Sequence, residues 1–262
     1  PFYGLLIACI DDPITKVILS RVNRPIVTYG FDAEADYRAT DFCQIGFNSK
    51  FTVRKKDDPR VSVSIDLKMP GSENVQNALA SFAVASEEGI AVDKIATGIE
   101  SFDGVSRRFQ YHGTFNLGQG KFMLVDDYGH HPNEVKSVIA AIRNGWPDSR
   151  LIMVYQPHRY SRTLEMFESF VDILSSVDHL LLLETYAAGE AALDGAGSED
   201  LFNQLKLKTS VSVKFVQSIQ EVPFLLESCV RPGDLVVTQG AGETAQIAKT
   251  LTQRWQGKEV IS

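Results

Sequence analysis

The fold class is indicated most clearly by the stretch Lys121-Phe122-Met123-Leu124-Val125-Asp126-Asp127-Tyr128-Gly129-His130-His131-Pro132. Residues 121–125 read as an apolar strand, and Pro132 suits the first turn of a helix. Polar and titratable side chains therefore follow the carboxyl end of a strand, where open α/β sheets bind their ligands. The alternative for these residues is a loop whose carboxylates only cap the helix. Taken as a whole, the stretch predicts a ligand site on an α/β sheet.

The same arrangement recurs one strand later. Residues 151–155 read as a strand, and the polar run Gln156-Pro157-His158-Arg159-Tyr160-Ser161-Arg162 opens another helix. Arg159 and Arg162 are three residues apart, so we expect them to share a face in the first helical turn. Two guanidinium groups beside a helix N-terminus would hold a carboxylate or a phosphate, although a solvated charged turn is the alternative. Two polar clusters after successive strands predict one crevice for an anionic ligand.

The rest of the chain supports an α/β fold of two parts. From Phe109 onward, helix-like stretches lie between most strand candidates, which are Phe109 to Gly113, Phe122 to Val125, Leu151 to Tyr155, His179 to Glu184, Val211 to Val216 and Asp234 to Thr238. This alternation predicts a doubly wound, Rossmann-like and mainly parallel sheet. We place the boundary near residues 106–108, which gives domains 1–107 and 108–262.

The first part reads as strands followed by helices. Strands are expected at residues 25–31, 50–55 and 61–67, and polar segments with Asp32, Asp36 and Asp41 join them. Ser72 is the expected N-cap of a helix that reaches Glu87, and a second helix follows Ala91. Asn74 and Asn77 stand at the start of the first helix, where carboxamides can bind an adenine edge or simply act as caps.

Composition and charge exclude several classes of protein. The net charge of −7 argues against broad nucleic-acid binding, which needs a basic surface. No apolar run approaches the roughly 18 residues of a membrane span, so we expect no membrane insertion. Cys9, Cys43 and Cys229 are odd in number and far apart, which predicts a reduced, cytoplasmic protein without a cysteine metal site. Residues 1–6 lack an initiator Met and a signal peptide's basic segment, so we expect a fragment cut inside a strand.

Three further motifs carry weaker signals. The pair Arg107-Arg108 lies at the expected domain junction, where it either reaches an anionic group or is ordinary solvated surface. Adjacent His130 and His131 point apart and make a poor metal site. The run 240–245 fits a loose GxGxxA dinucleotide fingerprint, but no strand follows to supply the acidic residue. We expect its glycines to form a tight turn that exposes backbone N–H groups, without a bound NAD.

Taken together, the motifs resemble the Mur ligase family, and within it the ligases that join L-alanine to UDP-N-acetylmuramate. The resemblance covers nearly the whole chain and rests on Pro1 to Gly4 with Asp11-Asp12-Pro13, Tyr29 to Phe31, Pro70-Gly71, Arg107 to Phe109, Asp126 to Pro132, Gln156 to Arg162, Tyr186 to Glu190 and Gln239 to Gly242. It implies that residues 1–107 are the later half of a central ATP-binding domain and that 108–262 are a C-terminal amino-acid-binding domain.

The resemblance also implies a reaction and its participants. ATP would phosphorylate the carboxylate of UDP-N-acetylmuramate, and the amine of L-alanine would attack the acyl phosphate. The phosphate-binding loop and the Mg²⁺ ligands would lie upstream, with no metal ligand in this chain, and no GxxxxGK[ST] pattern occurs in the 262 residues. This chain alone is therefore predicted to be inactive. The rival functions are a catalytically silent nucleotide- or amino-acid-binding module and a nicotinamide-dependent oxidoreductase.

Each candidate residue receives a role from the resemblance. The implied ATP-binding residues are Asn74 and Asn77 for the adenine, Asp127 for the ribose and Arg108 for the phosphates. The implied catalytic residues are Arg108 and His130, and the implied amino-acid and acyl-phosphate pocket also contains Tyr128, His158, Arg159 and Arg162. Glu73 departs from the family, which usually has His there, and a carboxylate beside a triphosphate is unfavourable.

Overall fold

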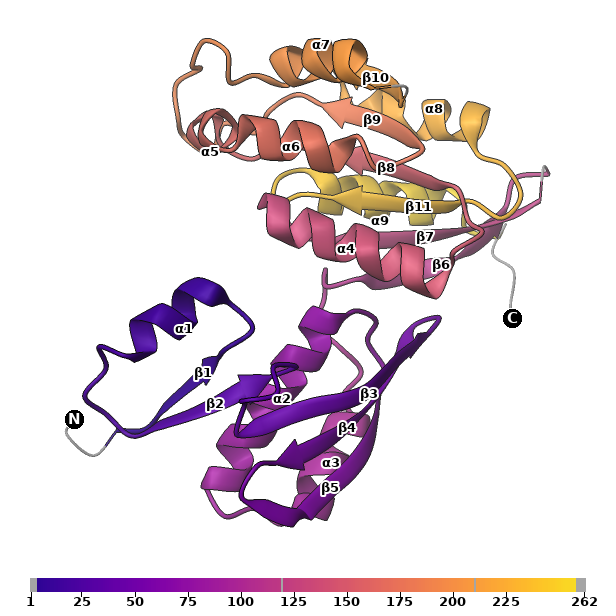
Figure 1. Ribbon diagram of the computed structural model, residues 1–262. Coiled ribbons are helices and arrows are strands. Elements are labelled where there is room, and N and C mark those ends of the chain that lie inside the picture. The colour runs from indigo at the N-terminus through magenta and orange to yellow at the C-terminus, as the bar shows by residue number, and fades with distance from the viewer. Residues whose placement is uncertain (1–3, 119, 210, 258–262) are drawn as a thin grey trace. The chain divides into compact units, whose positions relative to one another are not determined.

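The computed structural model describes residues 4–118, 120–209 and 211–257, and the chain divides into two compact units, unit 1 (1–104) and unit 2 (105–262) (Figure 1). Unit 1 contains β1 (Leu6–Cys9), α1 (Pro13–Leu19), β2 (Ile26–Gly30), β3 (Tyr37–Ile45), β4 (Asn48–Lys55), β5 (Asp58–Leu67), α2 (Ser72–Glu87) and α3 (Val92–Glu100). Its sheet has the order β1-β2-β3-β4-β5. The first three strands are parallel, and β4 and β5 continue the sheet as an antiparallel meander.

The core of unit 1 lies on one face of this sheet. Tyr37, Val53 and Ile65 point from β3, β4 and β5 into an apolar cluster, where they meet Leu79 and Phe82 of α2. All five are at most 1% exposed. Burying a side chain of this size contributes roughly 1.5–3 kcal/mol to the stability of the fold. Because side chains alternate between the two faces of a sheet, the buried residues also determine which residues of the meander lie on the opposite, outer face.

Three features of unit 1 differ from the sequence expectations. The polar segment around Asp41 is not a connection but part of β3, because a bulge between Thr40 and Cys43 shifts the register and interrupts the alternation of apolar residues. Helix α1 was not expected, and it begins where the side chain of Asp12 accepts the N–H of Thr15 at 2.6 Å. Ser72 does not cap α2; the N-cap position is Gly71, with φ 94°.

At the N-terminus, the strand expected over residues 1–6 begins only at Leu6, as β1, and residues 1–3 lie outside the described residues. The strands expected at 25–31, 50–55 and 61–67 correspond to β2, β4 and β5, and the second helix is α3. Local sequence patterns therefore located most of unit 1.

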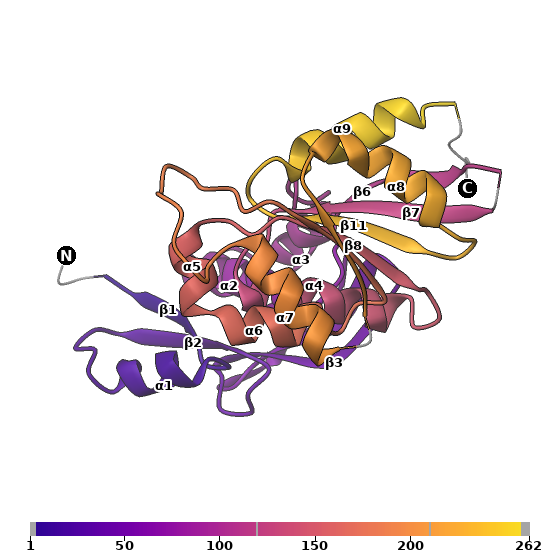
Figure 2. The same ribbon diagram turned by 90° about the horizontal axis from the view of Figure 1, so that it is seen from above.

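Unit 2 is a layered α/β domain. It contains β6 (Gln110–Asn116), β7 (Lys121–Asp127), α4 (Pro132–Gly145), β8 (Leu151–Tyr155), α5 (Tyr160–Glu165), α6 (Phe167–Leu174), β9 (His179–Leu183), α7 (Ser198–Lys208), β10 (Ser212–Val216), a 3-10 turn (Ile219–Glu221), α8 (Val222–Cys229), β11 (Leu235–Gln239) and α9 (Thr244–Arg254). The sheet order is β10-β9-β8-β11-β7-β6, and only β6 runs antiparallel to its neighbour. Helices α4, α6 and α7 lie on one side of this sheet and α8 and α9 on the other (Figure 2).

The central strands of unit 2 are buried on both faces. All five residues of β8 and of β11 are buried, which explains the apolar sequence of β8 and of the first three residues of β11. On the side of α8 and α9, the ring of Trp255 packs edge-on against Phe122 at 5.2 Å and near Phe115 at 5.4 Å. The predicted Rossmann-like, mainly parallel sheet is confirmed.

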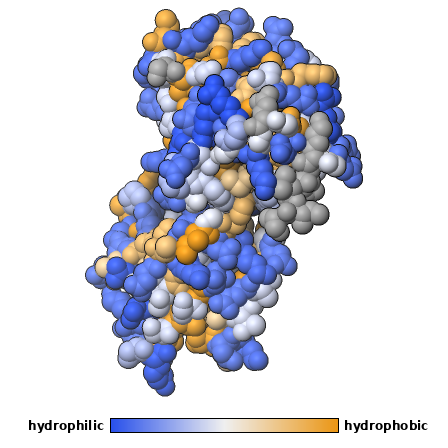
Figure 3. Space-filling model, turned by 90° about the vertical axis from the view of Figure 1, so that its right-hand side faces the viewer, coloured by the Kyte–Doolittle hydropathy of each residue, from blue (hydrophilic) through white to orange (hydrophobic). Residues whose placement is uncertain are grey.

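The face of the molecule seen in Figure 3 is mainly polar. Blue hydrophilic residues dominate the face seen in Figure 3, with hydrophobic residues scattered between them. Within the described residues, every helix is too short or too polar to cross a lipid bilayer.

Candidate functional site

The candidate site of unit 2 is built by loops at one edge of its sheet. Strands β7, β8, β9 and β11 are parallel, so their carboxyl ends meet at the same edge. The last strand, β11, lies between β7 and β8. Consequently the loops 128–131 and 156–159 approach each other across the loop 240–243, which follows β11.

Four aromatic side chains form a continuous row at this edge, which we call the ring row: Tyr128, His130, His158 and Tyr186. The ring centroids of Tyr128 and His130 are 5.4 Å apart, and those of His130 and His158 are 5.5 Å apart. Tyr186 stacks on His158 at 5.4 Å with an interplanar angle of 20°. The two polar clusters predicted to face one crevice therefore do meet, and a third loop, after β9, joins them.

Hydrogen bonds assign the tautomers of the two histidines. Nδ1 of His130 lies 3.3 Å from the carbonyl oxygen of Tyr128, which can only accept. We therefore assign the proton to Nδ1, which leaves Nε2 of the neutral ring as an acceptor. In His158 the roles are reversed, because Arg162 donates to its carbonyl oxygen at 2.9 Å and lies 3.3 Å from its Nδ1. Burial first, and then the nearby guanidinium of Arg162, lower the pKa of His158, which favours its neutral ring. Since an arginine can only donate, Nδ1 of His158 is the acceptor and its proton lies on Nε2.

Glu134 connects two of the predicted catalytic residues. Its Oε2 accepts the backbone N–H groups of His130 at 2.9 Å and His131 at 3.1 Å. Its Oε1 accepts Nη1 of Arg108 at 3.4 Å. Burial works to raise the pKa of Glu134, but these N–H groups and the nearby cations outweigh it and hold the pKa below its ordinary value. One carboxylate at the start of α4 thus orders the loop of His130 and attracts the half-exposed head of Arg108.

The two aspartates at the end of β7 are buried and used inside the protein. Asp127 is 4% exposed and accepts the N–H groups of Phe109 at 2.9 Å and Gly129 at 2.7 Å, and Nε2 of Gln239 at 3.2 Å. Burial raises the pKa of Asp127, against the opposing effect of the two N–H donors. A carboxylate has about four acceptor positions, so roughly one is left. A ribose contact by Asp127 stays a prediction, beside its evident role in ordering the loops.

Arg107 has a different role from Arg108. Its Nε donates to Asp126 at 2.9 Å, and its Nη2 donates to the carbonyl oxygen of Gly240 at 2.6 Å and to Oγ1 of Thr244 at 2.9 Å. The carboxylate of Asp126 is 2% exposed and the side chain of Arg107 is 19% exposed. The sequence left two alternatives for the arginine pair, an arm that reaches an anionic group or ordinary solvated surface. Neither alternative describes Arg107, because its guanidinium is bonded to groups within unit 2.

Arg159 and Arg162 do not share a helical face as expected. Helix α5 begins at Tyr160, and Arg159 precedes it with φ 73°. The N–H of Arg159 donates to the carbonyl oxygen of Tyr186 at 2.9 Å, and its guanidinium lies 3.9 Å from Glu190. The guanidinium of Arg162 instead donates to the carbonyl oxygen of His158. The two cations therefore have different partners, and Arg162 is the one in contact with the ring row.

Backbone strain gathers at this edge. Besides Arg159, positive φ values occur at Arg107 (60°), Phe109 (49°) and Ala188 (50°). Such conformations cost of order 1–3 kcal/mol each and persist only where other contacts enforce them. Here the N–H of Phe109 is held by Asp127 and that of Arg159 by Tyr186.

The glycine loop after β11 is packed closely against its neighbours. A Cβ on Gly242 would lie 2.4 Å from Oε1 of Gln156 and 2.9 Å from Cγ of Tyr186. Gln156 also accepts the N–H of Glu243 at 2.6 Å and donates to its carboxylate at 3.0 Å. The N–H of Gly240 donates to the carbonyl oxygen of Asp127. The expectation of exposed N–H groups is therefore wrong for Gly240 and Glu243.

Sequence reasoning missed several of the residues that hold this site together. Glu134 had a detectable signal, because a Glu at the third helical position completes a capping box with His131. Gln156, Tyr186 and Glu190 lie within motifs that carry the resemblance, but sequence reasoning assigned them no individual role. The contacts of Gln156 with Glu243 depend on β11 lying beside β8. Those of Tyr186 and Glu190 depend on the pairing of β8 with β9. No local pattern specifies this strand order.

The candidates in unit 1 lie on the first turns of α2. The side-chain N–H of Asn74 donates to the carbonyl oxygen of Pro70 at 2.7 Å. The side-chain oxygen of Asn74 is therefore the atom that could accept a hydrogen bond from a ligand. Asn77 and Glu73 are exposed. The arrangement leaves the adenine role of the two asparagines a prediction. Across the described residues of both units, no three His, Cys, Asp or Glu side chains are grouped so that they could hold a metal ion.

Comparisons with known proteins identify the family. Residues 107–242 match the family model described as "Mur ligase, glutamate ligase domain", and residues 1–85 match "Mur ligase middle domain". The UDP-N-acetylmuramate-alanine ligase MurC from Thermotoga maritima has a TM-score of 0.76 at 22% identity, over 97% of this chain and 52% of that chain. A murein peptide ligase from Psychrobacter arcticus has a TM-score of 0.68 at 22% identity, over 100% and 53%.

A third solved structure is the MurF ligase from Thermotoga maritima in complex with ADP. Its TM-score is 0.71 at 16% identity, over 98% of this chain and 55% of that chain. The chain thus spans about half the length of these three proteins. They share its fold, and because one family model alone covers more than half of its residues, the chain belongs to the Mur ligase family.

Proposed function

We propose that the chain is part of an ATP-dependent ligase that joins L-alanine to UDP-N-acetylmuramate through an acyl phosphate. The observation that carries this proposal is the ring row, with a proton acceptor at His130 Nε2 and two donors, His158 Nε2 and Arg162, beside it. Amide formation from an acyl phosphate and an amine requires both kinds of group. Membership of the Mur ligase family supports the reaction class.

The chemistry assigns a task to each group. The amine nitrogen of L-alanine bonds to the acyl carbon, the bond from that carbon to the phosphate oxygen breaks, and inorganic phosphate leaves. The attacking nitrogen must also lose a proton, and His130 Nε2 is the acceptor we propose for it. Negative charge develops on the acyl oxygen and on the leaving phosphate. Arg162 and the Nε2–H of His158 are the donors proposed to stabilise that charge.

Tyr128 and Arg159 are proposed to bind the amino acid at either end of the same pocket. The hydroxyphenyl ring of Tyr128 is 39% exposed, and the side chain of Arg159 is 52% exposed. Both can therefore contact a ligand without a rearrangement of the core. The carboxylate of L-alanine suits a guanidinium, which binds carboxylates with two parallel hydrogen bonds.

ATP contacts are proposed for residues of both units. Asn77, with its exposed carboxamide, and the side-chain oxygen of Asn74 would bind the adenine, and Asp127 would use its remaining acceptor position for the ribose. Arg108, whose ion pair with Glu134 is long at 3.4 Å, would turn to the phosphates and stabilise their developing charge. The ADP bound to a MurF ligase of the same fold supports a nucleotide ligand. Mg²⁺ would be held by residues outside this chain.

The proposed domain assignment follows the same resemblance. Residues 1–107 would belong to the central ATP-binding domain and residues 108–262 would form the amino-acid-binding domain. In the complete enzyme, the cytoplasm would be the place of action, because UDP-N-acetylmuramate and ATP are both used there.

The test is a phosphate-release assay with the complete gene product that contains these residues. We expect release that depends on ATP, UDP-N-acetylmuramate and L-alanine together. Proteins of the same fold include a murein peptide ligase and a D-alanyl-D-alanyl ligase from Acinetobacter baumannii, so a murein peptide and D-alanyl-D-alanine are assayed beside L-alanine. Preference for either would refute the choice of L-alanine, and absence of release with all three would favour a silent binding module. The 262-residue chain alone serves as the blank.

A further inference from the structure

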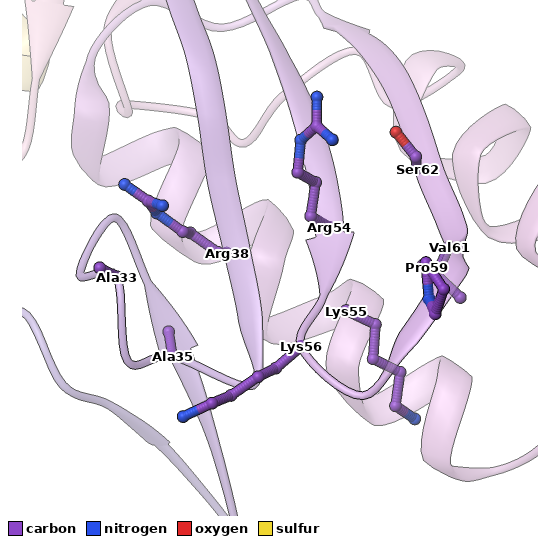
Figure 4. A pocket seen from close by; sticks show the side chains of 9 residues that line it. All are labelled: Ala33, Ala35, Arg38, Arg54, Lys55, Lys56, Pro59, Val61 and Ser62. Atoms are coloured by element: carbon purple, nitrogen blue, oxygen red, sulfur yellow. The ribbon is translucent and has the colours of Figure 1, made fainter.

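The outer face of the unit 1 sheet contains a hollow that the proposed ligase reaction does not use. Its volume is about 300 Å³, at the lower end of the range for small-molecule pockets. The side chains that surround it come from β3, β4, β5, the turn between β4 and β5, and the loop before β3 (Figure 4). Four of the nine lining residues are basic, in a chain whose net charge is −7. A general excess of cations therefore does not explain the cluster.

The strand register aligns three polar side chains along one wall of this hollow. Arg38 on β3 is directly opposite Arg54 on β4, and Arg54 is directly opposite Ser62 on β5. Adjacent residues Tyr37 and Val53 are fully buried in the core on the other face, so the row of three lies on the outer face. Neighbouring strands are roughly 5 Å apart, so the row spans about 10 Å, a distance over which the long side chains of the two arginines can reach one small oxyanion.

The two arginines of this row are poorly neutralised. Like charges directly opposite each other on neighbouring strands are destabilising. Among the described residues, no carboxylate lies within ion-pair distance of Arg38, whose Nε donates to the carbonyl oxygen of Phe31 at 3.1 Å. The only ion pair of Arg54 within that part of the chain is the 3.8 Å contact with Asp41, a side chain that is 68% exposed. Both guanidinium groups therefore keep terminal N–H donors for a ligand.

The two lysines of the hollow differ in availability. Lys56 lies at the rim and pairs with Glu34 at 3.1 Å, but the Glu34 side chain is 71% exposed, so a multivalent anion can compete for the ammonium. Lys55 extends away from Arg54 toward the helices (Figure 4). Its ammonium is 2.7 Å from the hydroxyl of Tyr37 and 3.0 Å from Glu87. The ligand-binding set is therefore Arg38, Arg54, Ser62 and Lys56.

We propose that this hollow binds a phosphate ester. A phosphate dianion has three equivalent terminal oxygens, which match two guanidinium groups and the Ser62 hydroxyl on three successive strands. A carboxylate has two coplanar oxygens and is satisfied by a single guanidinium. The remaining wall is apolar, with Ala35 and Pro59 among its residues, so it suits an uncharged organic group attached to the phosphate.

The test is an NMR titration of the 262-residue chain at constant ionic strength, with phenyl phosphate as the probe. The side-chain Nε–H signals of Arg38 and Arg54 report binding at the site itself. We expect Arg38→Gln and Arg54→Gln each to weaken phenyl phosphate binding about tenfold, the lower end for a charge-assisted contact. Lys50→Gln is the matched control, because Lys50 lies on β4 on the same face but pairs with Asp66 at 3.3 Å, outside the hollow.

Two further ligands test separately whether the hollow prefers an ester to free phosphate and whether it prefers phosphate to a carboxylate. Inorganic phosphate should bind several-fold more weakly than phenyl phosphate, and benzoate should bind most weakly. Equal affinity for the two phosphates would overturn the assignment of an ester, and equal affinity for benzoate would overturn the preference for phosphate. A loss in Lys50→Gln as large as in the two arginine variants, or no shift of the Arg38 and Arg54 signals, would overturn the site. If Arg38→Gln fails to fold, Arg54→Gln alone carries the test.

Discussion

The carboxyl edge of the unit 2 sheet and the outer face of the unit 1 sheet are both rich in charged side chains. They differ in how far these side chains are paired with other groups of the protein. In unit 2 almost every charged group already has a protein partner, such as Arg107 with Asp126 and Arg108 with Glu134. In unit 1 the guanidinium groups of Arg38 and Arg54 are left largely open. A substitution of a buried, fully paired group in the first region should therefore change the stability of the fold, whereas a substitution of one of these two arginines should mainly change ligand binding.

The largest effect is expected for Arg107→Ala. Removing one partner of a buried ion pair typically costs about 3–5 kcal/mol. Since the Arg107 side chain keeps 19% exposure, we expect the lower end of that range, about 3 kcal/mol. Both tryptophans of the chain, Trp146 and Trp255, belong to unit 2. Denaturant unfolding followed by tryptophan fluorescence therefore measures the stability of this unit specifically.

Arg108→Ala is the control for that measurement. The Arg108 side chain is 48% exposed and its ion pair with Glu134 spans 3.4 Å, so its loss should cost less than about 1 kcal/mol. Equal destabilisation by the two variants would contradict the division between a structural Arg107 and a ligand-facing Arg108.

The next largest effect is kinetic and concerns Arg162→Ala in the complete ligase. Loss of a charge-assisted contact of about 1.5–3 kcal/mol corresponds to a roughly 10- to 150-fold lower kcat/KM for L-alanine. Arg162→Lys should restore only part of this, because an ammonium lacks the planar fork of donors. Arg159→Ala should have a smaller effect, since its guanidinium is half exposed. Unchanged kinetics in both Ala variants, with the melting temperature preserved, would rule out the proposed pocket.

A third prediction contrasts the same substitution in the two units. Gly242→Ala should destabilise unit 2 by roughly 1–3 kcal/mol through overpacking, because its Cβ would lie 2.4 Å from Gln156 Oε1. Gly98→Ala in α3 should instead stabilise unit 1 by about 0.5–1 kcal/mol, since its Cβ would meet nothing within 4 Å. Tryptophan fluorescence follows the first variant and helix circular dichroism the second. A destabilising effect of the same size in both would show that close packing is not the cause.

The smallest expected effect is a dependence of unit 2 stability on pH. Nε2 of His112 is buried without a hydrogen-bond partner among the described residues, and burial lowers the pKa of this ring from its ordinary value of 6.5. As pH falls through 6.5, the unfolded chain binds a proton that the folded chain does not, so stability decreases until the folded-state pKa is reached. Burial also lowers the pKa of His158 and His179. His112→Asn should therefore reduce, but not abolish, the loss of stability between pH 7.5 and 5.5; an unchanged slope would exclude His112 as a contributor.

Local sequence patterns were sufficient for the strands and for the first members of the site. Strands β7, β8 and β11 are short apolar runs bounded by polar residues, and Pro132 begins α4 as expected. Strand β3 was missed because the bulge at Asp41, with φ 56°, breaks its alternation. Arg159 was placed inside a helix because a positive φ at a non-glycine residue has no signature in sequence. Contacts such as Gln156 with Glu243 arise from strand order, which depends on the whole sheet.

The position of β11 has a consequence for how the protein is made. This strand is the last of the sheet to leave the ribosome, yet it occupies the middle of the sheet. Until it emerges, the nascent chain holds two half-sheets, β6–β7 and β8–β9–β10, each with an unpaired apolar edge that invites aggregation. At usual rates of synthesis this interval lasts on the order of ten seconds. We therefore expect chaperone dependence during translation, and a ribosome stalled before Leu235 would hold a chain whose two histidine-bearing loops have not yet been brought together.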